Sequence, residues 1–135
     1  MKHVAIARSV RQWAEDLAKT TEEYPDSLGG LCAIASAELF NRLKGAGFDN
    51  TLIAYTDKHV YVVLDGYVID VTATQFGNYP KVFIETVSYA RDCGIWWNAT
   101  DFYESVDNLR AKQIEECWHL QHIVKPQVHS SLEVS

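Results

Sequence analysis

The segment HVYVVLDGYVIDVT, residues 59–72, predicts a β-hairpin and decides how we interpret the rest of the chain. Two runs of β-branched and aromatic residues flank Asp65-Gly66, and this dipeptide between such runs is typical of a two-residue type I′ turn. The turn fixes the register, with Leu64 opposite Tyr67. Side chains alternate along a strand, so one face is wholly apolar and the other is mixed. The apolar face holds Val60, Val62, Leu64, Ile69 and Val71, and the mixed face holds His59, Tyr61, Val63, Val68, Asp70 and Thr72.

His59 and Asp70 are diagonal neighbours on the mixed face. This register places their Cβ atoms about 7 Å apart, a distance at which an imidazole and a carboxylate can meet. The solvated side of a sheet is the simpler interpretation of such a pair. However, Tyr61, Val63 and Val68 lie on the same face, and a half-apolar strand face is typical of a covered site. The hairpin therefore predicts a buried His–Asp pair.

Cys32 lies at the start of a predicted helix, LCAIASAELFNRLK, residues 31–44, which Gly45 and Gly47 end. The first turn of a helix has unpaired N–H groups and a partial positive charge, and both favour a thiolate. Its backbone N–H groups are also possible donors to an oxyanion. Cys32, His59 and Asp70 are therefore the parts of an activated cysteine nucleophile, an orienting carboxylate included. The alternative is that Cys32 is a small, buried apolar residue.

Three side chains are candidate donors to an oxyanion: Gln12, Tyr24 and Gln75. Gln12 precedes the cysteine as the donor glutamine does in some cysteine hydrolases. A helix-capping box with Ser9 is the favoured interpretation of Gln12. The sequence gives no better case for Tyr24 or Gln75.

Composition restricts the partners that we expect. The chain has 135 residues and a formal net charge of −6, which predicts one domain. Lys and Arg are not concentrated in any stretch, so a nucleic acid is not an expected partner. No stretch approaches the ~20 apolar residues that span a bilayer, and the first residues do not resemble a signal peptide, so we expect a cytoplasmic protein and no membrane partner. The oligomeric state is not predicted.

The three cysteines are Cys32, Cys93 and Cys117. Their wide spacing and odd number do not suggest a disulfide framework, and the absence of a C-x-x-C motif argues against structural zinc. His119 and His122 lack further ligands nearby. We expect no metal and no cofactor, and free thiols in a reducing compartment.

The remaining segments predict helices and a strand meander, hence an α+β fold. We expect one domain over residues 1–124 and a poorly ordered tail over 125–135. The other predicted segments are a helix at 8–19, a strand at 51–55, a loop at 73–80, a possible strand at 81–85, an irregular aromatic segment at 93–100 and a helix at 101–119.

The segments GLCA (30–33) and HVYVVLDGYVIDVTATQF (59–76) resemble the core of transglutaminase-like cysteine proteins of the papain-like group. That resemblance covers roughly residues 28–76. It implies a helix that carries the nucleophile Cys32, packed on a small antiparallel sheet, with His59 as base and Asp70 as orienting acid. The chain departs from the family at Val60-Tyr61, where a small residue and Trp are frequent. Cell-wall peptidases of the NlpC/P60 type are a neighbouring possibility, although they usually have Asp-Cys-Ser at the nucleophile.

The resemblance and the residues together predict acyl transfer or hydrolysis at peptide or amide bonds, through a thioester on Cys32. The expected partner is a peptide or protein substrate. A binding module that keeps the scaffold without turnover is the alternative, because a fold alone does not determine function. A structural or interaction protein is a third possibility. It is suggested by aromatic residues that look exposed, namely Trp96, Trp97, Phe102 and Tyr103.

Overall fold

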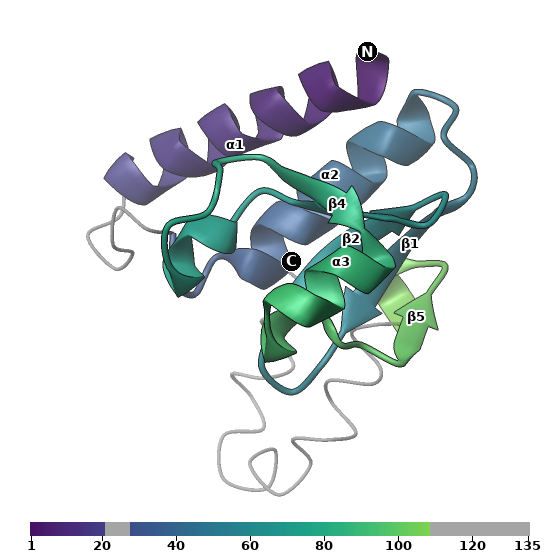
Figure 1. Ribbon diagram of the computed structural model, residues 1–135. Coiled ribbons are helices and arrows are strands. Elements are labelled where there is room, and N and C mark those ends of the chain that lie inside the picture. Colours follow the sequence, from purple (N-terminus) through teal and green to yellow (C-terminus); the bar gives the residue numbers. More distant parts are fainter. Residues whose placement is uncertain (21–27, 109–135) are drawn as a thin grey trace, which may run out of the picture.

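A computed structural model of the chain describes residues 1–20 and 28–108, which form an α+β fold around a five-stranded antiparallel sheet (Figure 1). The predicted α+β class is confirmed. The strand order is β4-β3-β2-β1-β5. The strands are β1 (Thr51–Tyr55), β2 (Val60–Leu64), β3 (Tyr67–Asp70), β4 (Phe83–Thr86) and β5 (Asp101–Tyr103), and the helices are α1 (Lys2–Thr20), α2 (Cys32–Gly45), α3 (Val87–Cys93) and the 3₁₀ turns η1 (Ala73–Phe76) and η2 (Ile95–Trp97).

The β2–β3 hairpin has the predicted turn and register. Asp65 and Gly66 have φ values of 52° and 83°, as a type I′ turn requires. Leu64 pairs with Tyr67, and Val62 pairs with Ile69. The turn therefore determines which side chains of the hairpin share a face.

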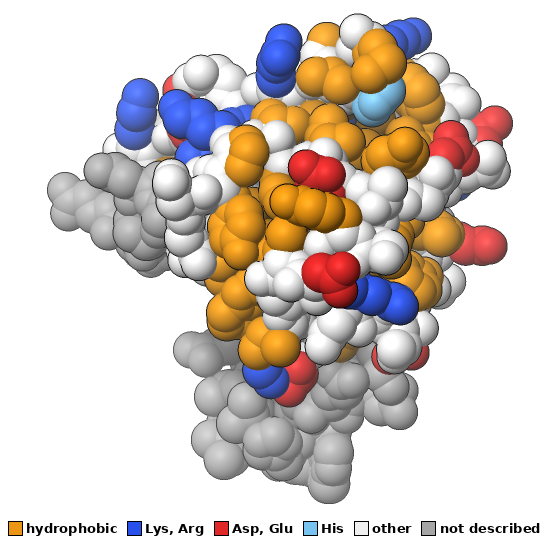
Figure 2. All heavy atoms as spheres, in the orientation of Figure 1, with side chains coloured by type: hydrophobic (Ala, Val, Ile, Leu, Met, Phe, Trp, Pro, Cys, Tyr) orange, Lys and Arg blue, Asp and Glu red, His pale blue; other side chains and the backbone are white. Residues whose placement is uncertain are grey.

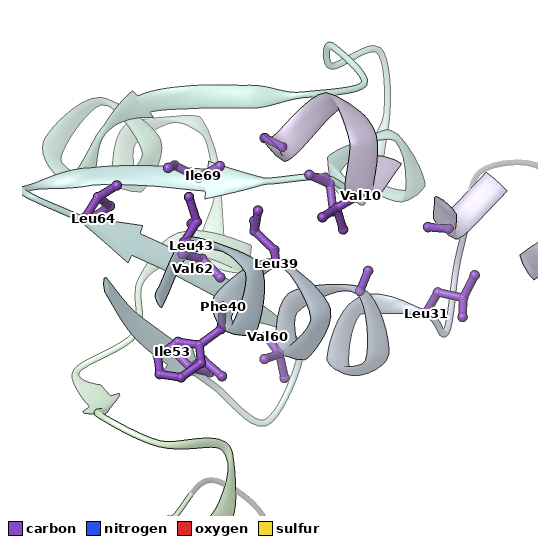
Figure 3. Packing of buried hydrophobic residues seen from close by; sticks show 14 of the residues in the cluster. Val10, Leu31, Leu39, Phe40, Leu43, Ile53, Val60, Val62, Leu64 and Ile69 are labelled. Atoms are coloured by element: carbon purple, nitrogen blue, oxygen red, sulfur yellow. The ribbon is translucent and has the colours of Figure 1, made fainter. Parts of the chain in front are cut away.

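The predicted apolar face of the hairpin packs against α1 and α2. Figure 3 shows Leu39 and Leu43 of α2 beside Val62 and Ile69 of the sheet. All four side chains are buried, and together with their neighbours they form the larger of the two cores. This packing fixes the position of α2 against the central strands.

The mixed face of the hairpin is covered as well, by η2, α3 and the segments around them. Tyr61, Val63 and Val68 pack there with Trp97 and Phe83 in a second core. Figure 1 shows α3 and α2 on opposite sides of the sheet. The expectation of a covered mixed face is confirmed.

Helix α1 begins at Lys2, six residues before its predicted start at Arg8. Ala7, Val10 and Ala14 are all buried, so the apolar face of the helix extends further toward the N-terminus than we predicted. Ser9 lies inside the helix and donates to the Ile6 carbonyl at 2.7 Å. The predicted capping box of Ser9 with Gln12 is therefore wrong.

The predicted helix at 101–119 is wrong at its start, where β5 occupies residues 101–103. Phe102 pairs with Ala54 and Tyr103 with Ile53, so the backbone of this aromatic segment satisfies the otherwise unpaired edge of β1. Residues 106–108 are helical, and residues 109–119 lie outside the described part of the chain. The predicted domain boundary at 124 and the tail at 125–135 also lie outside it.

Between the hairpin and β5, the structure contains more regular elements than we predicted. Strand β4 confirms the possible strand at 81–85, although it starts two residues later and ends one residue later, whereas α3 is not predicted. The segments expected to be loop and irregular contain the short 3₁₀ turns η1 and η2. Hydrophobic side chains are gathered on the surface around α3 and β4 in Figure 2. None of the described helices is both long and apolar enough to cross a membrane.

Candidate active site

His59 lies immediately before β2 and is held there by Thr56. The Thr56 N–H donates to the His59 carbonyl at 2.9 Å, and the Thr56 hydroxyl accepts from the His59 N–H at 3.0 Å. The His59 side chain is completely buried. Its backbone turn and its burial therefore fix the position of the imidazole.

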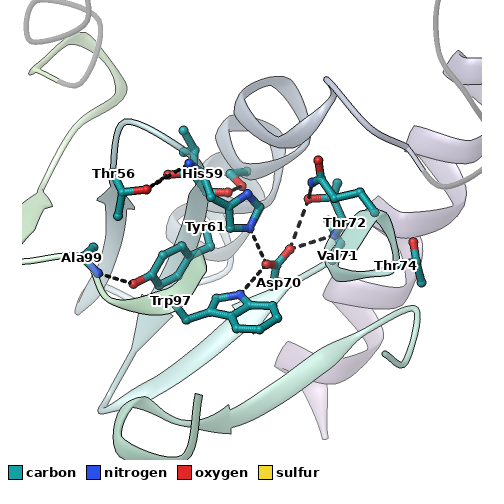
Figure 4. Close-up of polar contacts among 12 residues, drawn as sticks. Thr56, His59, Tyr61, Asp70, Val71, Thr72, Thr74, Trp97 and Ala99 are labelled. Atoms are coloured by element: carbon teal, nitrogen blue, oxygen red, sulfur yellow. Dashed lines mark hydrogen bonds and ion pairs between the residues drawn. The ribbon is translucent and has the colours of Figure 1, made fainter. Parts of the chain in front are cut away.

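Asp70 ends β3, and its carboxylate contacts four donor groups (Figure 4). Oδ2 lies 2.6 Å from His59 Nε2 and accepts from Trp97 Nε1 at 2.8 Å. Oδ1 accepts from the backbone N–H of Thr72 at 2.8 Å and from the Thr72 hydroxyl at 3.2 Å. The predicted His59–Asp70 contact is therefore present in the structure, and Asp70 is held from both sides.

These contacts determine the charges of the pair. Burial would raise the pKa of Asp70, but the charge of His59 and the hydrogen bonds from His59, Trp97 and Thr72 lower it. Burial lowers the pKa of His59, but the charge and hydrogen bond of Asp70, and then those of Cys32, raise it to about 9. At neutral pH the pair is accordingly an imidazolium and a carboxylate, with Nε2–H donating to Oδ2.

Cys32 is the first residue of α2 and is half-buried. Gly30 has a φ of 90°, a conformation that favours glycine, and it leads the chain into the helix. One turn further along α2, the Ser36 hydroxyl donates to the Val60 carbonyl at 3.0 Å, next to His59 in sequence. This bond joins the start of α2 to the start of β2.

Cys32 is near enough to the imidazole to raise the pKa of His59. Nδ1 of His59 is buried and has no hydrogen-bond partner of ordinary geometry within the described residues. With Nε2 committed to Asp70, Nδ1 is the nitrogen that remains for Cys32. The structure therefore brings His59 and Asp70 into direct contact, and the effect of Cys32 on the pKa of His59 places the start of α2 near this pair.

Aromatic rings surround the imidazole. Phe76 meets His59 edge-on with centroids 4.6 Å apart, and Tyr61 stacks on it at 5.7 Å. Trp96 stacks on Phe76 with ring centroids 4.2 Å apart. These rings exclude water from the His–Asp pair, which strengthens the attraction between the two charges.

Sequence reasoning missed the roles of Thr72 and Trp97. The sequence predicts Thr72 on the mixed face but not its bonds to Asp70, although an aspartate that accepts from the backbone N–H two residues later is a recurrent local motif. Trp97 was named among residues that look exposed, whereas it is fully buried. Its link to Asp70 spans 27 residues of sequence, and no local pattern indicates it.

The candidate oxyanion side chains have other contacts. Gln12 is exposed and donates to Asp16 on its own helix at 3.0 Å. Gln75 donates to the Thr72 hydroxyl at 3.1 Å and so supports the residue that holds Asp70. Tyr24 lies outside the described residues. Leu31, the residue before α2, does not cap the helix with its side chain. The first hydrogen bond within the helix is donated by the backbone N–H of Ala35.

Within residues 1–20 and 28–108, no three His, Cys, Asp or Glu side chains are grouped so that they could hold a metal ion. Comparisons of the chain with protein-family models, with curated proteins and with solved structures give no match. The resemblance to transglutaminase-like cysteine proteins thus remains a prediction from the residues.

Proposed function

We propose that this chain is a cysteine-dependent enzyme that hydrolyses or transfers the acyl group of a peptide or amide bond. The observation that carries the proposal is the buried imidazole of His59, which has Asp70 on Nε2 and Cys32 on the side of Nδ1. The same geometry supports a papain-like core, with the nucleophile helix α2 packed on an antiparallel sheet. The protonated His59 places a positive charge near Cys32, as a cysteine nucleophile requires.

The reaction has two steps. In the first, the Cys32 thiolate attacks the carbonyl carbon, the C–S bond forms, and the carbonyl oxygen becomes an oxyanion. The C–N bond then breaks, and the proton on His59 Nδ1 goes to the leaving amine. The products of this step are a thioester on Cys32, a free amine and a neutral His59.

In the second step, water or an amine attacks the thioester while His59 Nδ1 accepts its proton. The C–S bond breaks, and the thiolate and the imidazolium are restored. Throughout, the ionised Asp70 keeps Nε2 protonated and stabilises the imidazolium. We assign the oxyanion to the N–H groups of the first turn of α2, which no side chain of Leu31 caps. Of the candidate side chains, Gln12 and Gln75 have other partners, and Tyr24 lies outside the described residues.

The test is thioester formation. Wild type and the variants Cys32→Ala, His59→Ala and Asp70→Asn would be incubated with a library of peptide amides that includes glutamine, and with hydroxylamine to trap the acyl group. We expect release of amine and formation of hydroxamate by the wild type, and none by Cys32→Ala. Asp70→Asn should keep more activity than His59→Ala, because Asp70 touches no reacting atom.

Cys93→Ala is the matched control, since Cys93 is also half-buried but lies at the end of α3. It should retain full activity. Full activity in Cys32→Ala would refute the cysteine mechanism. A large fall in the melting temperature of all three site variants would instead indicate a structural role, and substrate binding without hydroxamate would favour the binding module.

A further inference from the structure

Trp97 contacts Asp70 but has no part in the two steps of the proposed reaction. Its side chain is fully buried, and its Nε1–H donates to the same oxygen of Asp70 that contacts His59 Nε2. Phe83 stacks on the indole with centroids 4.6 Å apart, and Tyr79 meets it edge-on at 5.0 Å. The ring is therefore fixed with its one polar group on the carboxylate.

The orientation of Asp70 does not depend on Trp97. Two bonds from Thr72 hold Oδ1, one of them from the backbone, and these already prevent rotation of the carboxylate. What the indole N–H adds is a second donor on Oδ2. Two donors on one oxygen share its negative charge, so each is held less tightly than it would be alone.

We propose that Trp97 is a positioning residue that acts through Asp70: its indole N–H shares Oδ2 with His59 and limits the pull of the carboxylate on the imidazolium. The inference rests on the proposed function, in which His59 must give a proton to the leaving amine. In a dry site a carboxylate with no other donor on Oδ2 would hold the imidazolium most strongly. Proton transfer is fastest when the acid is poised near the working pH, so the shared hydrogen bond favours turnover.

The test is the titration of His59, followed by NMR of the imidazole in protein with labelled histidine. Trp97→Phe keeps an aromatic ring but removes the N–H. We expect the His59 titration to move to higher pH in this variant. Trp13→Phe, the same change in a half-buried tryptophan of α1 that packs in the other core, is the control and should leave the titration where it is. A His59 titration midpoint that is unchanged in Trp97→Phe, or that moves to lower pH, would overturn the inference.

A double variant tests whether the effect passes through Asp70. In an Asp70→Asn background the carboxylate charge is absent, so Trp97→Phe should cause no further movement of the His59 titration. An equal movement in both backgrounds would show that the ring acts directly on His59 and would overturn the inference. If Trp97→Phe does not fold, the test uses the wild-type protein instead and follows the NMR resonance of the Trp97 indole N–H during the same pH titration.

That resonance should shift with the same midpoint as His59 and should lose this shift in Asp70→Asn. A resonance that does not respond to His59 would overturn the inference. These outcomes are separate from those of the proposed function. Absence of hydroxamate from the wild type would refute the enzyme activity, whatever the titrations show, whereas hydroxamate formation with an unmoved titration in Trp97→Phe would refute only the role of Trp97.

Discussion

Four donor groups contact the carboxylate of Asp70, and they account for a charge buried in an apolar core. A buried carboxylate without partners would become neutral, since desolvation disfavours its charged form. Here the acceptor positions of the two oxygens are occupied by His59, by Trp97 and by the backbone N–H and hydroxyl of Thr72. The ionised Asp70 in turn keeps His59 protonated, and the imidazolium lies beside Cys32.

This arrangement predicts a difference in reactivity between the cysteines. Cys32 should be alkylated by iodoacetamide faster than Cys93 or Cys117 at neutral pH, because it lies at the start of α2 and near the positive charge of the His59 imidazolium. Brief labelling followed by peptide mass spectrometry measures the three rates. His59→Ala should abolish the preference for Cys32. Preferential labelling of Cys93 or Cys117 in the wild type would contradict the prediction.

A second prediction at this scale concerns stability and pH. The pKa of His59 in the folded protein, about 9, exceeds its ordinary value of 6.5, because the charge and hydrogen bond of Asp70 and those of Cys32 outweigh the larger opposing effect of burial. Between these values the folded state binds a proton that the unfolded state does not. The stabilisation is therefore complete below pH 6.5 and is lost as the pH rises through about 9, an effect on the order of 3 kcal/mol.

The free energy of unfolding, measured with denaturant from pH 6 to pH 9.5, should accordingly fall more steeply in wild type than in His59→Gln. The contribution of Asp70 has the opposite sign, since its pKa is lowered: it is present above the ordinary value of 3.8 and is lost as the pH falls. Parallel curves for wild type and His59→Gln above pH 6.5 would show that His59 is not a buried cation.

At the scale of the elements, the β2–β3 turn fixes the hairpin register and so the diagonal placement of His59 and Asp70. Gly66 has a φ of 83° with open space around it, so an alanine there would be strained by its backbone alone. Gly66→Ala should lower the free energy of unfolding by about 1–2 kcal/mol. Denaturant unfolding at constant pH measures this loss.

Gly45→Ala is the control for that change. Gly45 ends α2, a Cβ there would also meet open space, and its φ is not in the left-handed region. Because alanine is the better helix former, this variant should be as stable as wild type or slightly more stable. A Gly66→Ala protein as stable as Gly45→Ala would mean that the turn is not the type I′ turn described above.

At the scale of the whole molecule, Arg11 joins α1 to the segment that follows Asp70. Its Nη1 donates to the Val71 carbonyl at 3.0 Å and to the Thr74 hydroxyl at 2.9 Å, while Nε pairs with Glu15 at 2.7 Å. The side chain is almost completely buried. Thr72 lies between the two acceptors, so Arg11 also fixes the backbone that holds Asp70.

Arg11→Met should therefore reduce the free energy of unfolding by about 2 kcal/mol, because it leaves a buried carbonyl without its donor. It should also slow the alkylation of Cys32, since the backbone around Thr72 loses its support. Arg8→Met, at an exposed position of the same helix, is the control and should change stability by less than about 0.5 kcal/mol. Equal losses in the two variants would contradict the role of Arg11.

The sequence alone determined the hairpin, its register, the helix with Cys32 in its first turn and the pairing of His59 with Asp70. These features depend on turn chemistry and side-chain periodicity, which act between near neighbours in the chain. Only the tertiary structure decided that residues 101–103 form a strand and that Trp97 donates to Asp70. The first depends on the unpaired edge of β1, and the second on the packing of η2 over the mixed face of the hairpin. Contacts between residues far apart in the chain leave no local pattern, because they form only when separate elements pack together.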